Sequence, residues 1–169
     1  MMKAIRKVST LKTRTARLSP EEIGRTFRER GLKVTPQRTA IYQTLIESPV
    51  HPTADHLYTQ VKRVYPMLSL NTVYHTLGVL RNAGLTHEVN YWHDRSQFDG
   101  NINPHHHLIC LGCRMIQDLT DASLDRLTVS SVRRTGFEVT GHQVEFYGYC
   151  TRCRRRNPAA KRKRKEWSV

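Results

Sequence analysis

The first half of the chain carries apolar residues at helical spacing, bounded by helix-start and helix-stop residues. Ser19-Pro20-Glu21-Glu22 combines an N-cap serine with proline at the first helical position and glutamate at N3, and Gly31 supplies a stop. Thr35-Pro36 repeats the start signal, and the second periodic stretch fades at Ser48-Pro49. The pattern predicts two short helices, the first over about residues 20–30.

Two further helices are predicted before the middle of the chain. Thr53 can cap the third helix, which Pro66 must end, and Ser69 opens the fourth, which stops at Gly84. The apolar positions at helical spacing are Leu57, Tyr58, Val61 and Val64 in the third helix and Val73, Leu77 and Leu80 in the fourth. Because DNA-binding motifs use a helix, a short turn and a second helix, this half of the chain is a candidate DNA-binding domain.

Strand and turn signals then replace the helical pattern. Leu85 to Val89 reads as a strand, Asn90 to Ser96 is polar and turn-like, and Gln97-Phe98 begins a return strand. These segments predict a two-stranded wing beside the helices. The breaker-rich stretch from Asp99 to Pro104 marks a hinge to a second unit.

The second unit is predicted to be a small α+β module. Its strands are expected at His107 to Leu111, Met115 to Leu119 and Gln143 to Tyr149. A helix is expected over residues 121–135.

The charge favours a polyanionic partner. The 169 residues have a formal net charge of +14 and a pI near 10.2, which is typical of proteins that bind nucleic acid or another acidic surface. Nine of the 28 lysines and arginines lie within residues 152–165, where no acid occurs, so this tail is predicted to be a solvated arm without regular structure. We interpret this tail and the basic leader before Ser19 as arms that add phosphate affinity without selecting a DNA sequence.

Neither a membrane span nor a secretion signal is visible. No run of about 18 or more apolar residues occurs, and the basic N-terminal stretch lacks the apolar core of a secretory signal. The sequence therefore predicts a cytoplasmic protein that does not cross a membrane.

Two CxxC pairs carry the strongest chemical signal. Cys110 and Cys113 form one pair and Cys150 and Cys153 the other, with 36 residues between the pairs. Two such pairs can close a tetrahedral thiolate cage around structural Zn²⁺, and the long gap leaves room for an inserted helix and strand. The alternative is a pair of redox-active or disulfide motifs, which a cytoplasmic location disfavours.

A histidine run directly precedes the first CxxC pair. In a strand, alternate side chains share a face, so His105 and His107 can bind one ion while His106 points away. Asp99 and Asp118 are the nearby carboxylates, and a mixed nitrogen and oxygen set favours Fe²⁺ or Mn²⁺. The alternative is a solvent-exposed histidine run.

Four motifs in order resemble the ferric uptake regulator family: HPTADHLY at 51–58, SLNTVYHTLGVLRNAGL at 69–85, HHHLICLGCRMIQDL at 105–119 and FYGYCTRC at 146–153. The resemblance covers about residues 20–153 and implies an α+β fold. This fold has an N-terminal winged helix-turn-helix DNA-binding domain, followed by a small α/β zinc-containing dimerisation domain. The expected segments are a basic leader (1–18), the DNA-binding domain (19–99), a hinge (100–103), the dimerisation and metal-binding domain (104–153) and a basic tail (154–169).

The resemblance also implies site residues. The positions that match the regulatory metal ligands are His51, Asp99, His105, His107 and Asp118. Aspartate at both 99 and 118 resembles the peroxide-responsive repressors, in which iron-catalysed oxidation strikes histidines that match His51 and His105. An extra metal site of some relatives matches His106, Asp125 and His142, although its fourth position is Pro104, whose side chain cannot coordinate an ion.

For DNA contact, the fourth predicted helix is the expected recognition element. Its exposed N-terminal half carries Asn71, Thr72, Tyr74 and His75, whose side chains suit base edges and thymine methyls. Tyr74 matches a base-contacting tyrosine of the family, Lys33 matches a lysine used in the minor groove, and His75 stands where many relatives have arginine or asparagine. The alternative interpretation of Tyr74 is a core aromatic.

Together these features predict a metal-dependent repressor that binds double-stranded operator DNA as a homodimer and senses hydrogen peroxide. The main alternative is an iron, zinc or manganese uptake repressor that senses metal occupancy. A metallohydrolase is disfavoured because HExxH and Gly-rich phosphate motifs are missing from the sequence. A purely architectural DNA binder would bind DNA equally well with and without the regulatory metal.

Overall fold

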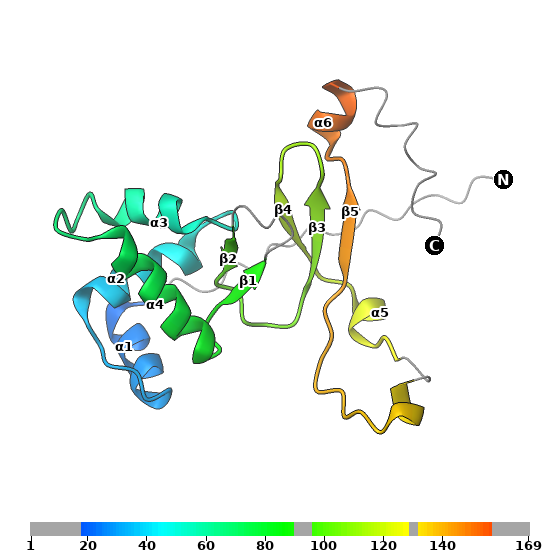
Figure 1. Cartoon of the computed structure of the whole chain (residues 1–169), viewed down its shortest axis with the longest axis horizontal. Helices are drawn as coiled ribbons and strands as arrows, with labels where there is room; N and C mark the ends of the chain where they lie inside the picture. The colour runs from blue at the N-terminus through cyan, green and yellow to red at the C-terminus, as the bar shows by residue number, and fades with distance from the viewer. Residues whose placement is uncertain (1–17, 90–95, 129–131, 157–169) are drawn as a thin grey trace. The chain divides into compact units, whose positions relative to one another are not determined.

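The computed structural model describes residues 18–89, 96–128 and 132–156. The described residues divide into two compact units, which we call the N-terminal unit (residues 18–103) and the C-terminal unit (residues 104–156). The N-terminal unit holds four helices and a two-stranded sheet, and the C-terminal unit is built on a three-stranded sheet (Figure 1). Among the described helices, none has the length and apolar character that a membrane span requires.

The four N-terminal helices begin where the sequence predicts them. They are α1 (Pro20–Glu29), α2 (Pro36–Glu47), α3 (Ala54–Val61) and α4 (Leu70–Asn82). Each is capped by a serine or threonine hydroxyl that accepts a hydrogen bond from the backbone of the first turn, and Ser19 forms a full capping box with Glu22. Gly31 and Gly84 follow α1 and α4 with positive φ angles of 69° and 67°, a conformation that glycine adopts at little cost.

Two apolar clusters hold these helices together. Ile41 and Leu45 of α2 pack with residues of α3 and α4, whereas Tyr42 and Ile46 face α1. The Tyr42 ring lies 5.4 Å from the Phe27 ring, centroid to centroid. The helix α2 is therefore apolar on two sides, because it lies between α1 and the α3–α4 pair.

The prediction that Val64 belongs to the third helix and its apolar face is wrong. The helix α3 ends at Val61, and Val64 is 73% exposed. Pro66 disfavours helical backbone at Tyr65, and the chain instead turns, with hydrogen bonds from the Val64 N–H to the Val61 carbonyl and from the Leu68 N–H to the Tyr65 carbonyl. This turn leads directly into the Ser69 cap of α4.

The wing is shorter than predicted. Its strands are β1 (His87–Val89) and β2 (Gln97–Asp99), which pair antiparallel with His87 opposite Asp99. Leu85 lies before β1 and is buried in the apolar cluster that contains Phe27 and Tyr42. Most of the predicted turn, residues 90–95, lies outside the described residues.

Gly100 follows β2 against the backbone of α2. A Cβ atom at Gly100 would lie 3.1 Å from the Ile46 Cα and 3.2 Å from its backbone nitrogen, which cannot swing away as a side chain can. We expect Gly100→Ala to lower the free energy of unfolding by about 1–3 kcal/mol, measured by urea denaturation. Gly78→Ala on α4 is the matched control, because its methyl group meets no atom within 4 Å and a helix gains about 1 kcal/mol from alanine. Equal effects of the two substitutions would contradict the packing argument.

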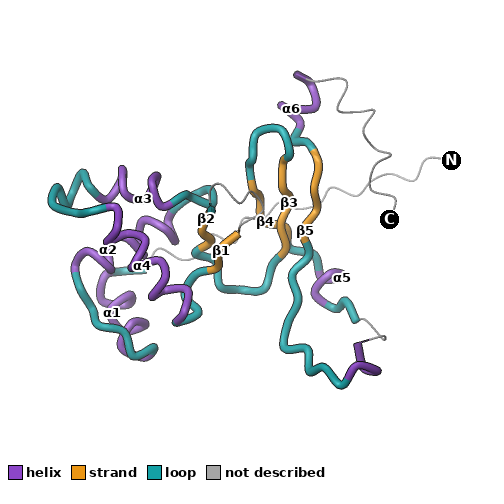
Figure 2. Tube along the Cα trace, viewed as in Figure 1, coloured by secondary structure: helices purple, strands orange, loops and turns teal. Residues whose placement is uncertain are grey.

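The C-terminal sheet places β3 at its centre. The strand β3 (His106–Cys110) pairs antiparallel with β4 (Ile116–Leu119) and parallel with β5 (Glu145–Gly148). The helices α5 (Ala122–Asp125) and α6 (Thr151–Arg156) lie near opposite ends of this sheet (Figure 2). The predicted α+β class is confirmed.

The predicted helix over residues 121–135 is wrong. The structure has a single helical turn, α5, capped by Asp121, and a separate 3-10 helix at Val132–Thr135. Residues 129–131 between them lie outside the described residues. The stretch after α5 is rich in serine, threonine and valine, which favour helices least among ordinary residues because of hydroxyl competition and β-branching.

The predicted irregular arm after Cys153 is wrong at its start. Residues Thr151–Arg156 form α6, in which the Arg154 N–H donates to the Cys150 carbonyl at 2.9 Å. Arginine is a good helix former, and the cysteines at positions 150 and 153 fix this first turn against the sheet. Residues 157–169 of the predicted tail, and residues 1–17 of the leader, lie outside the described residues.

Candidate metal centres and recognition helix

The four cysteines converge at one end of the C-terminal sheet. The pairing of β3 with β4 makes the Cys110–Cys113 turn, and the parallel pairing of β3 with β5 brings Cys150 alongside. Two hydrogen bonds fix this approach: the Leu111 N–H donates to the Gly148 carbonyl at 2.7 Å, and the Cys150 N–H donates to the Cys110 sulfur at 3.2 Å. All four sulfur atoms lie within 4.8 Å of one another.

The sulfur geometry fits a tetrahedral metal cage. The Sγ atoms of Cys113 and Cys150 are 3.7 Å apart, close to the roughly 3.8 Å expected for two sulfurs each about 2.3 Å from one zinc ion. A disulfide would require about 2.05 Å, and all four cysteines are free thiols in this structure. The arrangement suits structural zinc.

The thiols of the cage differ in acidity. Burial opposes ionisation of Cys110, but backbone N–H groups of Cys150, Cys113 and Gly112 outweigh it and lower its pKa to about 6. Burial and the neighbouring cysteines raise the pKa of Cys153 to about 12. The Cys110 thiol therefore ionises readily, and its negative charge opposes ionisation of the neighbouring thiols. A divalent cation is needed to hold all four sulfurs as thiolates.

Gly112 is a functional residue that our sequence reasoning missed. A Cβ atom there would lie 2.9 Å from both the Cβ and the Sγ of Cys153. The turn of the first CxxC pair therefore has room for the second pair only with glycine at this position. A glycine inside a CxxC motif was the available signal.

His51 and Asp99 form a pair within the N-terminal unit. His51 lies in the α2–α3 connection, which runs beside β2 because the Phe98 N–H donates to the Pro52 carbonyl at 2.9 Å. Asp99 ends β2, and its Oδ2 lies 3.6 Å from the His51 Nε2. An imidazole and a carboxylate aimed at each other can share a proton or bind a divalent cation together.

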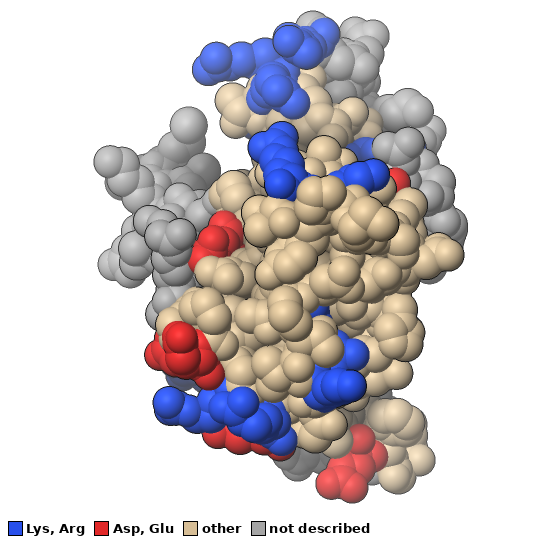
Figure 3. All heavy atoms as spheres, turned by 90° about the vertical axis from the view of Figure 1, so that its left-hand side faces the viewer, with Lys and Arg blue, Asp and Glu red and all other residues tan. Residues whose placement is uncertain are grey.

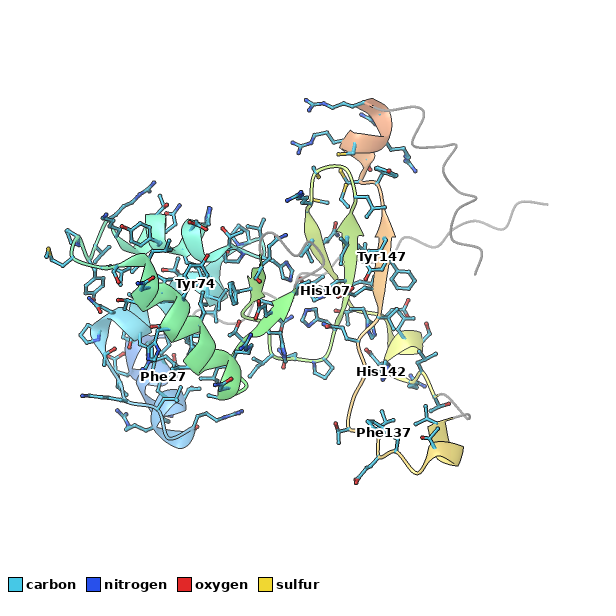
Figure 4. The ribbon with its side chains drawn as sticks, in the orientation of Figure 1. Phe27, Tyr74, His107, Phe137, His142 and Tyr147 are labelled. Carbon is cyan, nitrogen blue, oxygen red and sulfur yellow. The ribbon has the colours of Figure 1, made fainter. Side chains whose placement is uncertain are left out.

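His105 and His107 form a second pair within the C-terminal unit. Their Nε2 atoms are 3.0 Å apart and their rings meet edge to face. In the β3–β4 register, His107 stands opposite Asp118, so both side chains belong to the same face of the sheet. The shared face of His105 and His107 is as predicted, and Figure 4 marks His107 on β3.

The chain is similar to known proteins over most of its length. The sequence profile of the ferric uptake regulator family matches residues 29–147. The chain belongs to this family. It is 40% identical over 128 residues to the peroxide operon regulator of Bacillus subtilis (strain 168), covering 76% of this chain and 88% of that one. It is 38% identical to the peroxide-responsive repressor PerR of Staphylococcus aureus (strain Mu50) over 79% of this chain and 90% of that one.

A solved relative shares the fold. The peroxide stress regulator of Campylobacter jejuni is 29% identical, with a TM-score of 0.62, over 79% of this chain and 97% of that one. The ferric uptake regulator family consists of transcriptional regulators, so the interpretation as a regulator rather than an enzyme is confirmed.

The residues matched to the family's extra metal site also approach one another. The His106 Nε2 lies 3.2 Å from an Asp125 carboxylate oxygen, and the His106 and His142 rings stack at 5.9 Å. However, the His106 Nδ1 accepts from the Val144 N–H, and the His142 Nε2 lies 2.7 Å from the Leu124 carbonyl. These protein partners give the three side chains a role without an ion, as a link between β3, α5 and the approach to β5.

The recognition helix expected from the family, α4, presents polar residues to solvent. Asn71 and His75 are exposed, as is Lys33 before α2, and Tyr74 is 49% exposed although the core interpretation required burial. Thr72 is half-buried, and its hydroxyl lies 2.8 Å from the Ser69 hydroxyl at the helix cap. Figure 3 shows that the exposed face of the N-terminal unit is mostly uncharged at its centre, with basic side chains in separate groups.

Three other histidines take no part in these clusters. His56, His75 and His87 are exposed, and His93 lies outside the described residues.

Proposed function

We propose that this protein is a metal-dependent transcriptional repressor that binds double-stranded operator DNA as a homodimer and releases it when hydrogen peroxide oxidises its metal site. The family membership supports the repressor, and the likeness to two peroxide regulators supports the signal. The observation that carries the proposal is the pair of imidazole and carboxylate clusters on either side of the Asn103–Pro104 boundary.

The two clusters act as halves of one regulatory site. Asp99 and His105 are six residues apart, so the chain holds their Cα atoms within about 20 Å whatever the linker conformation. His51 and Asp99 from one unit, with His105, His107 and Asp118 from the other, make a nitrogen and oxygen donor set that suits Fe²⁺ or Mn²⁺. An ion that binds both halves favours conformations in which the two units are joined. If only those conformations bind the operator, metal binding raises the affinity for DNA.

The chain supplies the residues that peroxide oxidises. Bound Fe²⁺ would supply the first electron that cleaves the O–O bond and would regain an electron from the oxidised ring. In the net reaction one peroxide oxygen is inserted into an imidazole C–H bond of His51 or His105, and the other leaves as water. The oxidised ring is a poorer ligand, so the ion is released and the two units lose their link. The four cysteines would hold Zn²⁺ throughout as a structural ion.

Mass spectrometry after a peroxide pulse tests this proposal. We expect the iron-loaded, anaerobic protein to gain one oxygen on the peptides that contain His51 or His105 and to lose operator binding in gel shifts. The manganese-loaded protein is the matched control and should stay unmodified. Unmodified histidines with DNA binding intact would instead support a repressor that senses iron, zinc or manganese occupancy.

A further inference from the structure

The chain that leaves β2 makes two consecutive turns, each closed by a side-chain oxygen. The Asn101 N–H donates to the Asp99 Oδ1 at 2.8 Å. The Asn103 N–H then donates to the Asn101 Oδ1 at 3.2 Å, and the Asn103 side-chain amide donates to the same oxygen at 3.1 Å. These are successive Asx turns, in which a short side chain replaces a backbone carbonyl.

The first turn is fixed to the N-terminal unit on both sides. The Thr86 hydroxyl donates to the backbone carbonyl of Asp99 at 2.6 Å, and both residues are buried. Gly100 lies so close to the Ile46 backbone that even a methyl group at this position would be crowded, 3.1 Å from the Ile46 Cα. The backbone of Asp99 therefore cannot shift without disturbing the β1–β2 sheet or α2.

The two carboxylate oxygens of Asp99 have different partners. Oδ1 accepts from the Asn101 N–H, whereas Oδ2 lies 3.6 Å from the His51 Nε2. We propose that Asp99 offers the regulatory ion one oxygen only, while its other oxygen holds the turn that starts the linker. Asp99 thereby couples ion binding to the conformation of residues 100–103. Asn101 is a positioning residue, because its side-chain oxygen in turn fixes the backbone of Asn103. The coupling rests on the regulatory site proposed above.

The turn predicts that position 99 requires aspartate in this chain. An Asx turn needs an acceptor oxygen one bond beyond Cγ, and glutamate places its oxygens one methylene farther away. Glutamate therefore keeps the charge but loses the turn. Asparagine keeps the acceptor but loses the charge.

Amide hydrogen exchange, followed by NMR, separates these contributions in the metal-free protein. We expect Asp99→Glu to speed exchange of the Asn101 amide about 10-fold or more, and Asp99→Asn to leave it within about 3-fold of wild type. Asn101→Ala should speed the Asn103 amide while the Asn101 amide stays protected. Asp55→Glu, at an exposed position of α3, is the control and should change neither amide.

Adding Mn²⁺ during the exchange period tests the coupling; exchange is then quenched and the ion removed with chelator before the spectra are recorded, because bound Mn²⁺ broadens the NMR signals of nearby amides. Exchange of both amides should slow in the wild type and not in Asp99→Asn, which keeps the turn without the charge. An Asn101 amide equally protected in wild type and Asp99→Glu would overturn the assignment of Oδ1 to the turn. Binding of Mn²⁺ is measured separately by an electron paramagnetic resonance titration. If Mn²⁺ binds but does not slow exchange of the two amides, the coupling is overturned and the proposed regulatory site is retained. Failure of Mn²⁺ to bind would refute the proposed regulatory site. The exchange rates of the metal-free variants would still show whether the Asp99 Oδ1 closes the turn.

Discussion

Replacing Cys150 by serine is expected to abolish zinc binding and to unfold the C-terminal unit. The Cys150 backbone and sulfur connect β5 to the Cys110–Cys113 turn, and structural zinc in small domains contributes about 10–16 kcal/mol to folding. A protein domain is usually stable by only about 5–15 kcal/mol, so losing the ion exceeds what the remaining contacts of a three-stranded sheet supply.

Zinc content by elemental mass spectrometry and the near-ultraviolet circular dichroism signal measure this effect. Met115→Ala is the matched control, because Met115 lies next to the same turn, is 40% exposed and carries no ligand sulfur of the cage. The control should retain zinc and near-wild-type stability. A Cys150→Ser protein that keeps about one zinc ion per chain and a cooperative unfolding transition would contradict the structural role of the cage.

Replacing His107 by alanine is expected to remove the metal dependence of operator binding. His107 lies on β3, the central strand of its sheet, its ring meets that of His105 edge to face, and Asp118 stands opposite it. Changing a residue that merely orients a ligand costs about 10–100-fold in metal affinity, so loss of a ligand should weaken Mn²⁺ binding by about 100-fold or more. Operator affinity should then fall to the level of the chelator-treated wild type.

Isothermal titration with Mn²⁺ and gel shifts with and without chelator measure the two effects. His107→Gln is a second variant that fills the buried space, which separates loss of a ligand from loss of packing. His56→Ala is the surface control and should behave as wild type. Chelator-sensitive operator binding with an unchanged Mn²⁺ midpoint in His107→Ala would show that His107 is not a ligand.

Much of the N-terminal unit could be predicted because its signals are local. A serine or threonine cap followed by apolar residues at helical spacing determined where α1 to α4 begin, and glycine or proline marked where α1, α2 and α4 end. The errors arose where propensity is weak. Val64 falls at helical spacing although α3 has already ended at Val61. The stretch 121–135 has apolar residues at helical spacing but also a run of serine, threonine and valine, which favour helices weakly.

The candidate sites were predictable in kind and only partly in detail. CxxC spacing identifies the four cysteines, and strand alternation places His105 and His107 on a shared face. Spacing alone says nothing about contacts between distant segments. The close approach of Gly112 to Cys153 and of Gly100 to Ile46 is therefore visible only in the tertiary structure.

The sequence by itself determined the helix starts, the candidate ligand types and the family, because each depends on residues close together in the chain or on motifs in a fixed order. Tertiary structure alone decided that β5 lies parallel to β3, which joins two cysteine pairs 36 residues apart into one cage. It also decided that one oxygen of Asp99 faces His51 while the other closes the linker turn. The physical reason is that such contacts follow from how strands pair and loops pack, and local side-chain preferences do not encode those long-range choices.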